Sequence, residues 1–172
     1  MCKLILGGAR SGKSRFAESL ALNYENVHYI ATAIAVDEEI RQRIKVHQSQ
    51  RPDHWITIEA PLQLAGALDE IDDKSHCVLI DCLTFWVNNC LFESTEKWES
   101  ERQKFLRCIA GFKGQLIMVS NETGMGIAPK GALTRQFVDA IGWLHQDLAM
   151  SSETVLLMVA GIPTVLKGSL DI

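Results

Sequence analysis

The stretch Gly7-Gly8-Ala9-Arg10-Ser11-Gly12-Lys13-Ser14 fits the pattern G-x-x-x-x-G-K-[ST] of a phosphate-binding loop. The apolar residues 2–6 before it predict a first strand, and apolar residues at helical spacing follow it. In such a loop the backbone N–H groups turn toward a polyphosphate, and the next helix adds the positive end of its dipole. We expect Lys13 to reach the β- and γ-phosphates and the Ser14 hydroxyl to ligate Mg²⁺. The stretch therefore predicts binding of a nucleoside triphosphate, which many chemistries share.

Length and composition indicate one soluble domain. The chain has 172 residues, of which 47% are hydrophobic and 22% charged, so residues 1–172 are expected to form a single domain. The net charge of −4 argues against broad nucleic-acid binding. No signal pattern precedes the first strand, and no apolar run is long enough to span a bilayer. The five cysteines form no C-x-x-C pair, which argues against a disulfide framework or a zinc site. These features predict a cytoplasmic protein without a membrane span.

A second nucleotide-binding pattern lies at residues 77–81. Four apolar residues end in Asp81, as in a Walker B strand whose terminal carboxylate faces Mg²⁺. Many strands end in aspartate, so the pattern gains its weight from the phosphate-binding loop. The two motifs together predict Mg²⁺ as the cofactor, held by Ser14 and Asp81, with GTP or ATP as substrate.

The rest of the chain alternates between strand and helix patterns. Further strands are expected at residues 27–33, 55–59, 115–119, 154–159 and 162–166. Helices are expected at residues 37–50, 60–71, 93–107 and 133–150, and the apolar residues 83–92 are interpreted as core rather than as the wall of a substrate site. This order predicts an α/β fold, a three-layer P-loop NTPase (RecA-like) domain. Its sheet is expected to be mostly parallel, with a short antiparallel edge strand at 162–166.

His47 lies on the predicted helix 37–50, on one face with Ile40 and Ile44. A neutral imidazole can attack phosphorus and leaves well once it is protonated. A single histidine beside an apolar stripe is nevertheless more often structural, so the spacing alone favours a structural role. Arg51-Pro52 ends the helix and places a permanent cation near His47.

Two strand ends carry residues suited to a ligand site. The small residues Ala31-Thr32-Ala33 leave space for a ligand at the sheet edge, although close packing against a helix explains them equally well. Residues 120–126 combine polar groups with G-x-G, which suggests a mobile active-site segment or a plain glycine-rich turn.

Several motifs, taken in order along the chain, resemble one family. They are the phosphate-binding loop, residues 29–33, Arg43-Ile44 with His47 and Arg51-Pro52, Trp55, residues 59–61 and 81–84, Asn121-Glu122 with residues 124–126, and residues 161–163. This combination is similar to the bifunctional adenosylcobinamide kinase/adenosylcobinamide-phosphate guanylyltransferases of cobalamin biosynthesis, over essentially the whole chain. The resemblance implies phosphorylation of adenosylcobinamide by a nucleoside triphosphate, followed by transfer of GMP from GTP to give adenosylcobinamide-GDP. The chain differs from the family pattern at residues 128–131 and at Trp143, outside the nucleotide motifs.

The resemblance also assigns roles to residues. The family transfers GMP through a covalent GMP-histidine at the position of His47, which reverses the structural interpretation. Lys13 is implied to be catalytic by neutralising phosphate charge, Glu59 is suited to accept hydrogen bonds from guanine, and Asn121 and Glu122 are implied to lie in a substrate loop. The residues implied to bind nucleotide are Gly7, Gly8, Ala9, Arg10, Ser11, Gly12, Lys13, Ser14, Ala31, Thr32, Ala33, Gln48, Ser49, Gln50, Arg51, Glu59 and Asp81. Members of the family form homo-oligomers, typically trimers.

Two other functions remain open from the residues themselves. A P-loop small-molecule kinase without transferase activity would keep Lys13, Ser14 and Asp81 functional and return His47 to a structural role. A regulatory nucleotide-binding module would use residues 121–126 as a switch. Covalent labelling by GTP separates the bifunctional enzyme from both.

Overall fold

A seven-stranded sheet forms the centre of the molecule. The structure is a computed structural model that describes residues 1–35, 38, 41–42, 48, 51–71 and 76–170. Across the sheet the strand order is β3-β2-β4-β5-β1-β6-β7. The strands are β1 (Cys2–Gly7), β2 (Asn26–Ala31), β3 (Ile56–Glu59), β4 (His76–Asp81), β5 (Gln115–Asn121), β6 (Thr154–Val159) and β7 (Ile162–Lys167). All neighbouring strands are parallel except β6 and β7, so the predicted antiparallel edge strand is confirmed.

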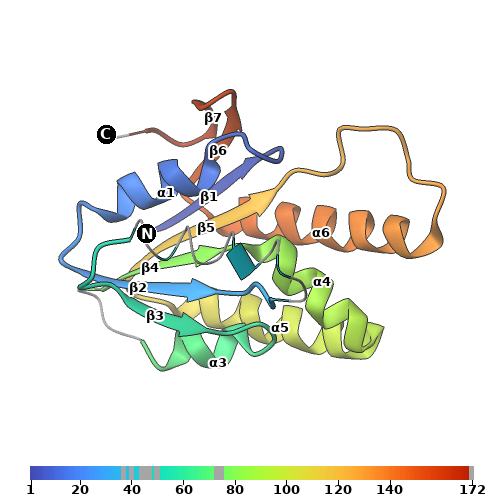
Figure 1. The fold of residues 1–172 in the computed structure, drawn as a ribbon, viewed down its shortest axis with the longest axis horizontal. Helices are drawn as coiled ribbons and strands as arrows, with labels where there is room; N and C mark the ends of the chain where they lie inside the picture. Colours follow the sequence, from blue (N-terminus) through green and yellow to red (C-terminus); the bar gives the residue numbers. More distant parts are fainter. Residues whose placement is uncertain (36–37, 39–40, 43–47, 49–50, 72–75, 171–172) are drawn as a thin grey trace.

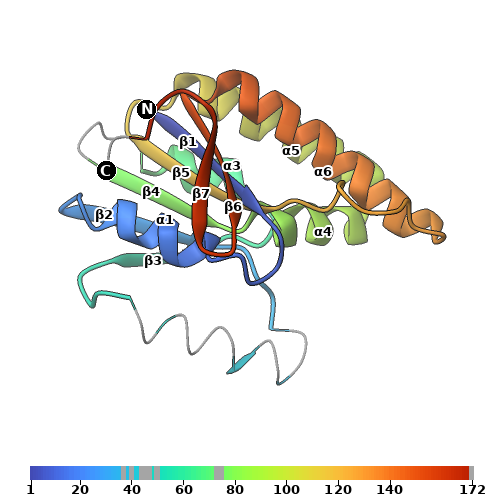
Figure 2. The same ribbon diagram turned by 90° about the horizontal axis from the view of Figure 1, so that it is seen from above.

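Helices cover both faces of this sheet (Figures 1 and 2). Helix α1 (Lys13–Ala21) packs on one face, and on the other face lie α3 (Leu64–Asp69), α4 (Leu83–Glu93), α5 (Thr95–Gly111) and α6 (Ala132–Ser151). Successive side chains of a strand point to opposite faces. In β4, Val78 and Ile80 therefore join the core under α3–α6, while Cys77 and Leu79 join the core under α1. The three-layer α/β prediction is confirmed.

Several element boundaries differ from the sequence prediction, and at three of them the hydrogen bonds of the backbone explain the difference. Helix α3 begins at Leu64 rather than near Pro61, because the carbonyls of Pro61 and Leu62 accept hydrogen bonds from side chains of α4. Strand β5 continues to Asn121, because it stays paired with β1 up to Gly7. Strand β2 ends at Ala31, and the next carbonyl, that of Thr32, accepts from an α4 asparagine.

The apolar stretch at residues 83–92 is mainly core, as predicted. Leu83, Trp86, Val87 and Cys90 on α4 are buried, while Phe92 is 81% exposed. The Trp86 ring makes edge contacts with the rings of Trp98 and Phe105 on α5, at centroid distances of 5.4 and 5.0 Å. These aromatic contacts fix α4 against α5.

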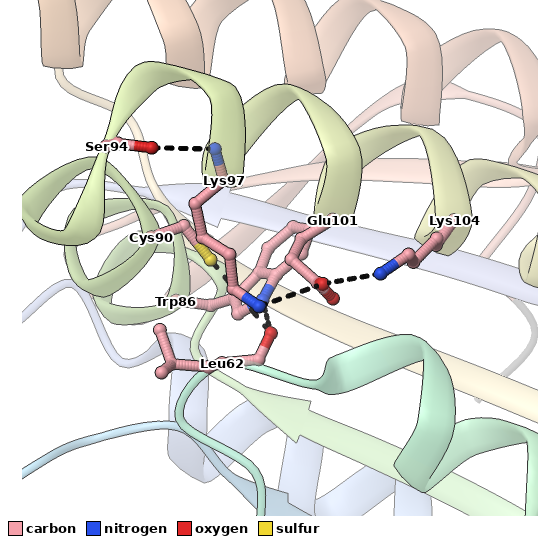
Figure 3. A network of polar contacts seen from close by, with 7 residues as sticks. All are labelled: Leu62, Trp86, Cys90, Ser94, Lys97, Glu101 and Lys104. Carbon is pink, nitrogen blue, oxygen red and sulfur yellow. Dashed lines mark hydrogen bonds and ion pairs between the residues drawn. The ribbon is translucent and has the colours of Figure 1, made fainter.

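A buried carboxylate on α5 is paired with two lysines of the same helix (Figure 3). Glu101 is 2% exposed and accepts hydrogen bonds from the ammonium groups of Lys97 at 3.2 Å and Lys104 at 2.9 Å. Burial alone would raise the pKa of Glu101, but these two lysines more than offset it and the pKa lies below its ordinary value. The Ser94 hydroxyl accepts from the Lys97 backbone N–H at 3.0 Å and caps the start of α5. The charge-rich helix predicted from residue 93 is therefore amphipathic, with one ionised group inside it.

Candidate active site

The carboxyl ends of the parallel strands gather the predicted site residues at one edge of the sheet. Ala31 is paired with Glu59 on one side and with Asp81 on the other, and Gly7 is paired with Asn121. Because β5 lies between β4 and β1, the Walker B strand and the phosphate-loop strand flank it. Four strand spacings, roughly 19 Å, separate β3 from β1. Ligands of open α/β sheets bind at this edge.

The phosphate-binding loop has the conformation that its glycines permit. Gly7, Arg10 and Gly12 have positive φ angles of 153°, 57° and 93°. A Cβ on Gly7 would lie 2.6 Å from the Met158 carbonyl oxygen, so no larger residue fits there. The first glycine of the loop therefore packs directly against the backbone of β6.

Lys13 begins α1 and lies across this loop. Its ammonium donates to the Gly8 carbonyl at 2.6 Å, and the residue is only 7% exposed. Burial lowers the pKa of Lys13, and the negative charges of Cys82 and Asp81 when ionised oppose that shift. The lysine is thus within electrostatic reach of the Walker B aspartate, as phosphate binding requires.

The turn between β6 and β7 supports the loop from outside. The Gly161 N–H donates to the Ser11 carbonyl at 2.9 Å, and a Cβ on Gly12 would lie 3.2 Å from the Gly161 Cα. Ala160 and Gly161 have φ angles of 52° and 81°, and Val159 pairs with Ile162. Positive φ at both central residues of a two-residue hairpin loop is the requirement of a type I′ turn.

Asp81 belongs to a stack of three side chains. The Tyr29 hydroxyl donates to Asp81 Oδ2 at 3.0 Å, and the Arg51 guanidinium carbon lies 3.4 Å from the centre of the Tyr29 ring. Burial and the Asp81 charge raise the pKa of Tyr29, so its hydroxyl stays protonated and donates. Arg51 Nε and Nη1 are buried without a hydrogen-bond partner among the described residues. The stack places the Arg51 guanidinium on the Tyr29 ring, beside the Walker B strand.

Thr32 links the segments that follow β2 and β4 by hydrogen bonds at this edge of the sheet. Its hydroxyl donates to the Cys82 carbonyl at 2.6 Å and accepts from the Cys82 N–H at 3.0 Å, and the residue is fully buried. The Thr32 carbonyl accepts from Asn89 Nδ2 at 2.9 Å. This side chain fixes the segments after β2 and β4 relative to each other, and its contact with a nucleotide stays a prediction.

The structure describes some of the remaining predicted site residues and leaves others outside the described ranges. Glu59 is exposed at the end of β3, and its carboxylate has no hydrogen-bond partner among the described residues. Ala31, Ala33 and Ser14 are half-buried, and Gly8, Ala9, Arg10 and Gln48 are exposed. His47, Ser49 and Gln50 lie outside the described residues.

The donor set at the loop fits Mg²⁺. Among the described residues no group of three or more His, Cys, Asp or Glu side chains could hold a metal. Magnesium keeps several waters and takes one or two protein oxygens plus substrate phosphates, so a hydroxyl and a carboxylate suffice. Ser14 and Asp81 are the hydroxyl and the carboxylate that the sequence predicts for this pair, and their role as ligands stays a prediction.

Sequence reasoning gave no individual role to Thr84, Ser120 or His145, although Ser120 lies in the predicted active-site segment 120–126 and Thr84 in the motif 81–84. His145 Nε2 lies 2.8 Å from Ser120 Oγ, Ser120 Oγ lies 3.4 Å from Thr84 Oγ1, and His145 Nδ1 lies 3.8 Å from Glu122 Oε2. Ser120 directly follows the predicted strand 115–119, and His145 lies four residues after the buried Ile141 on α6. Polar residues at such core-facing positions are the signal that could have identified them.

The fold and the loop together define a P-loop nucleoside-triphosphate-binding domain. A solved structure from Pyrococcus horikoshii OT3 shares the fold with a TM-score of 0.57 at 9% identity, over 99% of this chain and 87% of that one. An ATPase from the type III secretion system of pathogenic bacteria matches with a TM-score of 0.50 at 7% identity, over 90% of this chain and 50% of that one. At these identities the likeness concerns the fold alone.

The chain belongs to the cobinamide kinase / cobinamide phosphate guanyltransferase family, whose model matches residues 3–166. It is 49% identical to the bifunctional adenosylcobalamin biosynthesis protein CobP of Pseudomonas aeruginosa, over 98% of both chains. It is 35% identical to the bifunctional adenosylcobalamin biosynthesis protein CobU of Escherichia coli K12, over 97% of this chain and 100% of that one. The family inferred from the motifs is thereby confirmed, and with it a bifunctional kinase and guanylyltransferase of cobalamin biosynthesis.

Proposed function

We propose that both reactions take place at the carboxyl edge of the sheet, with His47 as the transient carrier of GMP. The observation that carries this proposal is that Lys13, Asp81 and Glu59 lie at the carboxyl edge of one sheet, beyond or at the ends of β1, β4 and β3. The phosphate-binding loop would hold the triphosphate, and the exposed carboxylate of Glu59 would accept hydrogen bonds from the guanine.

For the kinase step, the loop and Lys13 bind the γ-phosphate. The Lys13 ammonium, which bonds the Gly8 carbonyl in the structure, would turn to the β- and γ-phosphate oxygens when nucleotide enters. Mg²⁺ would be held by Ser14 and Asp81 and would neutralise charge between the β- and γ-phosphates. Tyr29 orients the Asp81 carboxylate by donating to Oδ2.

For the transferase step, the His47 imidazole attacks the α-phosphorus of GTP. A P–N bond forms, the bond from the α-phosphorus to its bridging oxygen breaks, and pyrophosphate leaves with the electron pair. A phosphate oxygen of adenosylcobinamide phosphate then attacks the same phosphorus, and the imidazole leaves. Arg51 supports this assignment, because it follows His47 by four residues and has buried donors without a partner among the described residues. A buried guanidinium whose donors have no partner among the described residues is suited to donate hydrogen bonds to a phosphate oxygen.

Labelling with α-labelled GTP and Mg²⁺, followed by denaturation, tests this proposal. The wild type should retain label that is labile to acid and stable to alkali, and His47→Ala should retain none. The matched control is His54→Ala, which removes an exposed histidine outside the predicted site and should label like the wild type. Lys13→Ala should label about 100-fold more slowly or worse, because it loses a donor to the phosphates.

Absence of label on the wild type, with GTP shown to bind, would overturn the role of His47. Label that persists in His47→Ala would move the carrier to another residue. Phosphorylation of cobinamide without any covalent label would leave a kinase alone.

Three further statements belong to this proposal. We expect Mg²⁺ dependence in both reactions, a homo-oligomer such as the trimer typical of the family, and a location in the cytoplasm. No helix in the described ranges is both long and apolar enough to cross a membrane.

A further inference from the structure

Glu122 lies beside the first residue of the phosphate-binding loop. Its backbone N–H donates to the Gly7 carbonyl at 3.0 Å, and it directly follows Asn121, the residue paired with Gly7. Strand β5, which delivers it, runs between the phosphate-loop strand β1 and the Walker B strand β4. A carboxylate that follows this strand therefore lies between the loop that would bind the triphosphate and Asp81, the aspartate that would bind the metal.

A chain of polar side chains leads to this carboxylate. The Asn121 N–H donates to Thr84 Oγ1 at 2.7 Å, Thr84 Oγ1 lies 3.4 Å from Ser120 Oγ, and Ser120 Oγ lies 2.8 Å from His145 Nε2. The other ring nitrogen, Nδ1, faces Glu122 Oε2 at 3.8 Å. The network thus joins β5, the start of α4, the middle of α6 and the loop after β5.

The two ring nitrogens of His145 face different partners. The Thr84–Ser120–His145 contacts accommodate donation in either direction. Nδ1, however, faces a carboxylate oxygen of Glu122, which is an acceptor, and this favours a proton on Nδ1. In that neutral tautomer Nε2 accepts from the Ser120 hydroxyl, and the Nδ1–H faces Glu122.

Burial favours this neutral form. His145 is 7% exposed and Ser120 is fully buried. Burial lowers the pKa of His145, although the nearby Glu122 acts in the opposite direction. The Glu122 side chain is 20% exposed, and its Oε1 accepts from the Gly124 N–H at 2.5 Å. One carboxylate oxygen is thus held by the loop, and the other faces a fixed N–H.

We propose that Glu122 is the catalytic base of the kinase step and that His145 is its positioning residue. The cobinamide hydroxyl oxygen forms a bond to the γ-phosphorus while its proton passes to the Glu122 carboxylate. The bond from the γ-phosphorus to the β,γ-bridging oxygen breaks, and the nucleoside diphosphate leaves with that electron pair. The proton then passes from Glu122 to water. This proposal rests on the kinase activity of the family and does not depend on His47.

The two activities of one protein provide the internal control. Kinase rate is measured with adenosylcobinamide and triphosphate, and transferase rate with adenosylcobinamide phosphate and GTP. Glu122→Gln should lower the kinase kcat by about 100-fold or more, the usual contribution of a general base, with the transferase rate within about threefold of wild type. Glu70→Gln, which changes an exposed glutamate just after α3 and outside this network, should change neither rate.

Two replacements of His145 test the positioning role. His145→Asn can keep an N–H near the Nδ1 position, whereas His145→Gln keeps only a group near Nε2. We expect His145→Asn to retain at least about tenfold more kinase kcat than His145→Gln, with the same KM for triphosphate in both. A purely structural role would lower both activities of each variant together.

Three outcomes would overturn the proposal. One is a Glu122→Gln kinase kcat within about threefold of wild type. Another is a parallel loss of kinase and transferase rates, which would make the network structural. The third is a rise in the KM for cobinamide with kcat unchanged, which would make Glu122 a binding residue. Absence of GMP labelling on His47 would leave these measurements interpretable, since they follow the other reaction.

Discussion

Three polar side chains near the carboxyl edge of the sheet are buried, and each is hydrogen-bonded. Lys13 donates to a loop carbonyl, Thr32 bonds both backbone groups of Cys82, and His145 bonds Ser120. Each buried group has a partner that offsets part of the cost of leaving water. Burial lowers the pKa of both Lys13 and His145, so both bases hold their protons less firmly than they would in water.

The buried His145 predicts a specific dependence of stability on pH. In the unfolded chain a histidine titrates near pH 6.5, and in the folded protein burial lowers the pKa of His145. Between these two values the unfolded chain binds a proton that the folded chain does not. The free energy of unfolding therefore falls as the pH drops below about 6.5. Above that pH His145 is neutral in both states and no longer lowers the free energy of unfolding. One group gives at most about 1.4 kcal/mol per pH unit.

Urea unfolding of the wild type and of His145→Gln between pH 5 and 8 measures this effect. The wild type should lose stability more steeply below pH 6.5 than the variant does. His28, whose pKa is also lowered by burial, contributes equally to both proteins and cancels in the comparison. Parallel curves would show that His145 is as easily protonated in the folded state as in the unfolded state.

At the scale of elements, the strands and their order along the chain could be predicted, whereas long-range contacts could not. Residues 154–159 match β6, and the core residues of α4 were identified from their apolar run. The late start of α3 depends on Trp86 and Asn89, which lie more than twenty residues away along the chain. The contact between Gly161 and Ser11 joins opposite ends of the chain. Propensity describes the local preference only, so partners of this kind leave no local signal.

The type I′ turn at Ala160-Gly161 gives a prediction for the β6–β7 hairpin. Ala160→Asn should raise the free energy of unfolding by about 0.5–1 kcal/mol, because Asn tolerates the left-handed region better than Ala and precedes Gly in the preferred turn. Gly161→Ala should lower it by about 1 kcal/mol or more, since nothing crowds that Cβ and the positive φ alone opposes it. Thermal unfolding of the two variants measures both changes. A shift of the same sign for both would contradict the turn assignment.

At the scale of the whole molecule, exposed apolar side chains lie on α6 and on the segment before it, which runs outside the three layers of the fold. The segment between β5 and α6 runs away from the sheet and returns to the start of α6 (Figure 1). Met125, Ile127 and Leu133 on this segment and at the start of α6 are 76%, 98% and 81% exposed, and Trp143 on α6 is 57% exposed. Trp143 and Arg135 also line a hollow of about 320 Å³ between α4, α5 and α6. Several exposed apolar side chains along one segment and the helix after it are typical of a surface that another chain covers.

We therefore expect the first part of α6 and the segment before it to form the contact of the homo-oligomer. Ile127→Asp should raise the dissociation constant of the assembly at least about tenfold, because covering such a side chain contributes about 1.5–3 kcal/mol and a buried carboxylate adds a desolvation cost. Sedimentation over a range of protein concentrations measures this. Leu22→Asp is the control, because Leu22 is 59% exposed just after α1, on the opposite layer, and its variant should sediment as the wild type. A monomeric wild type would rule out the assembly. An Ile127→Asp protein that stays assembled would place the contact on another surface.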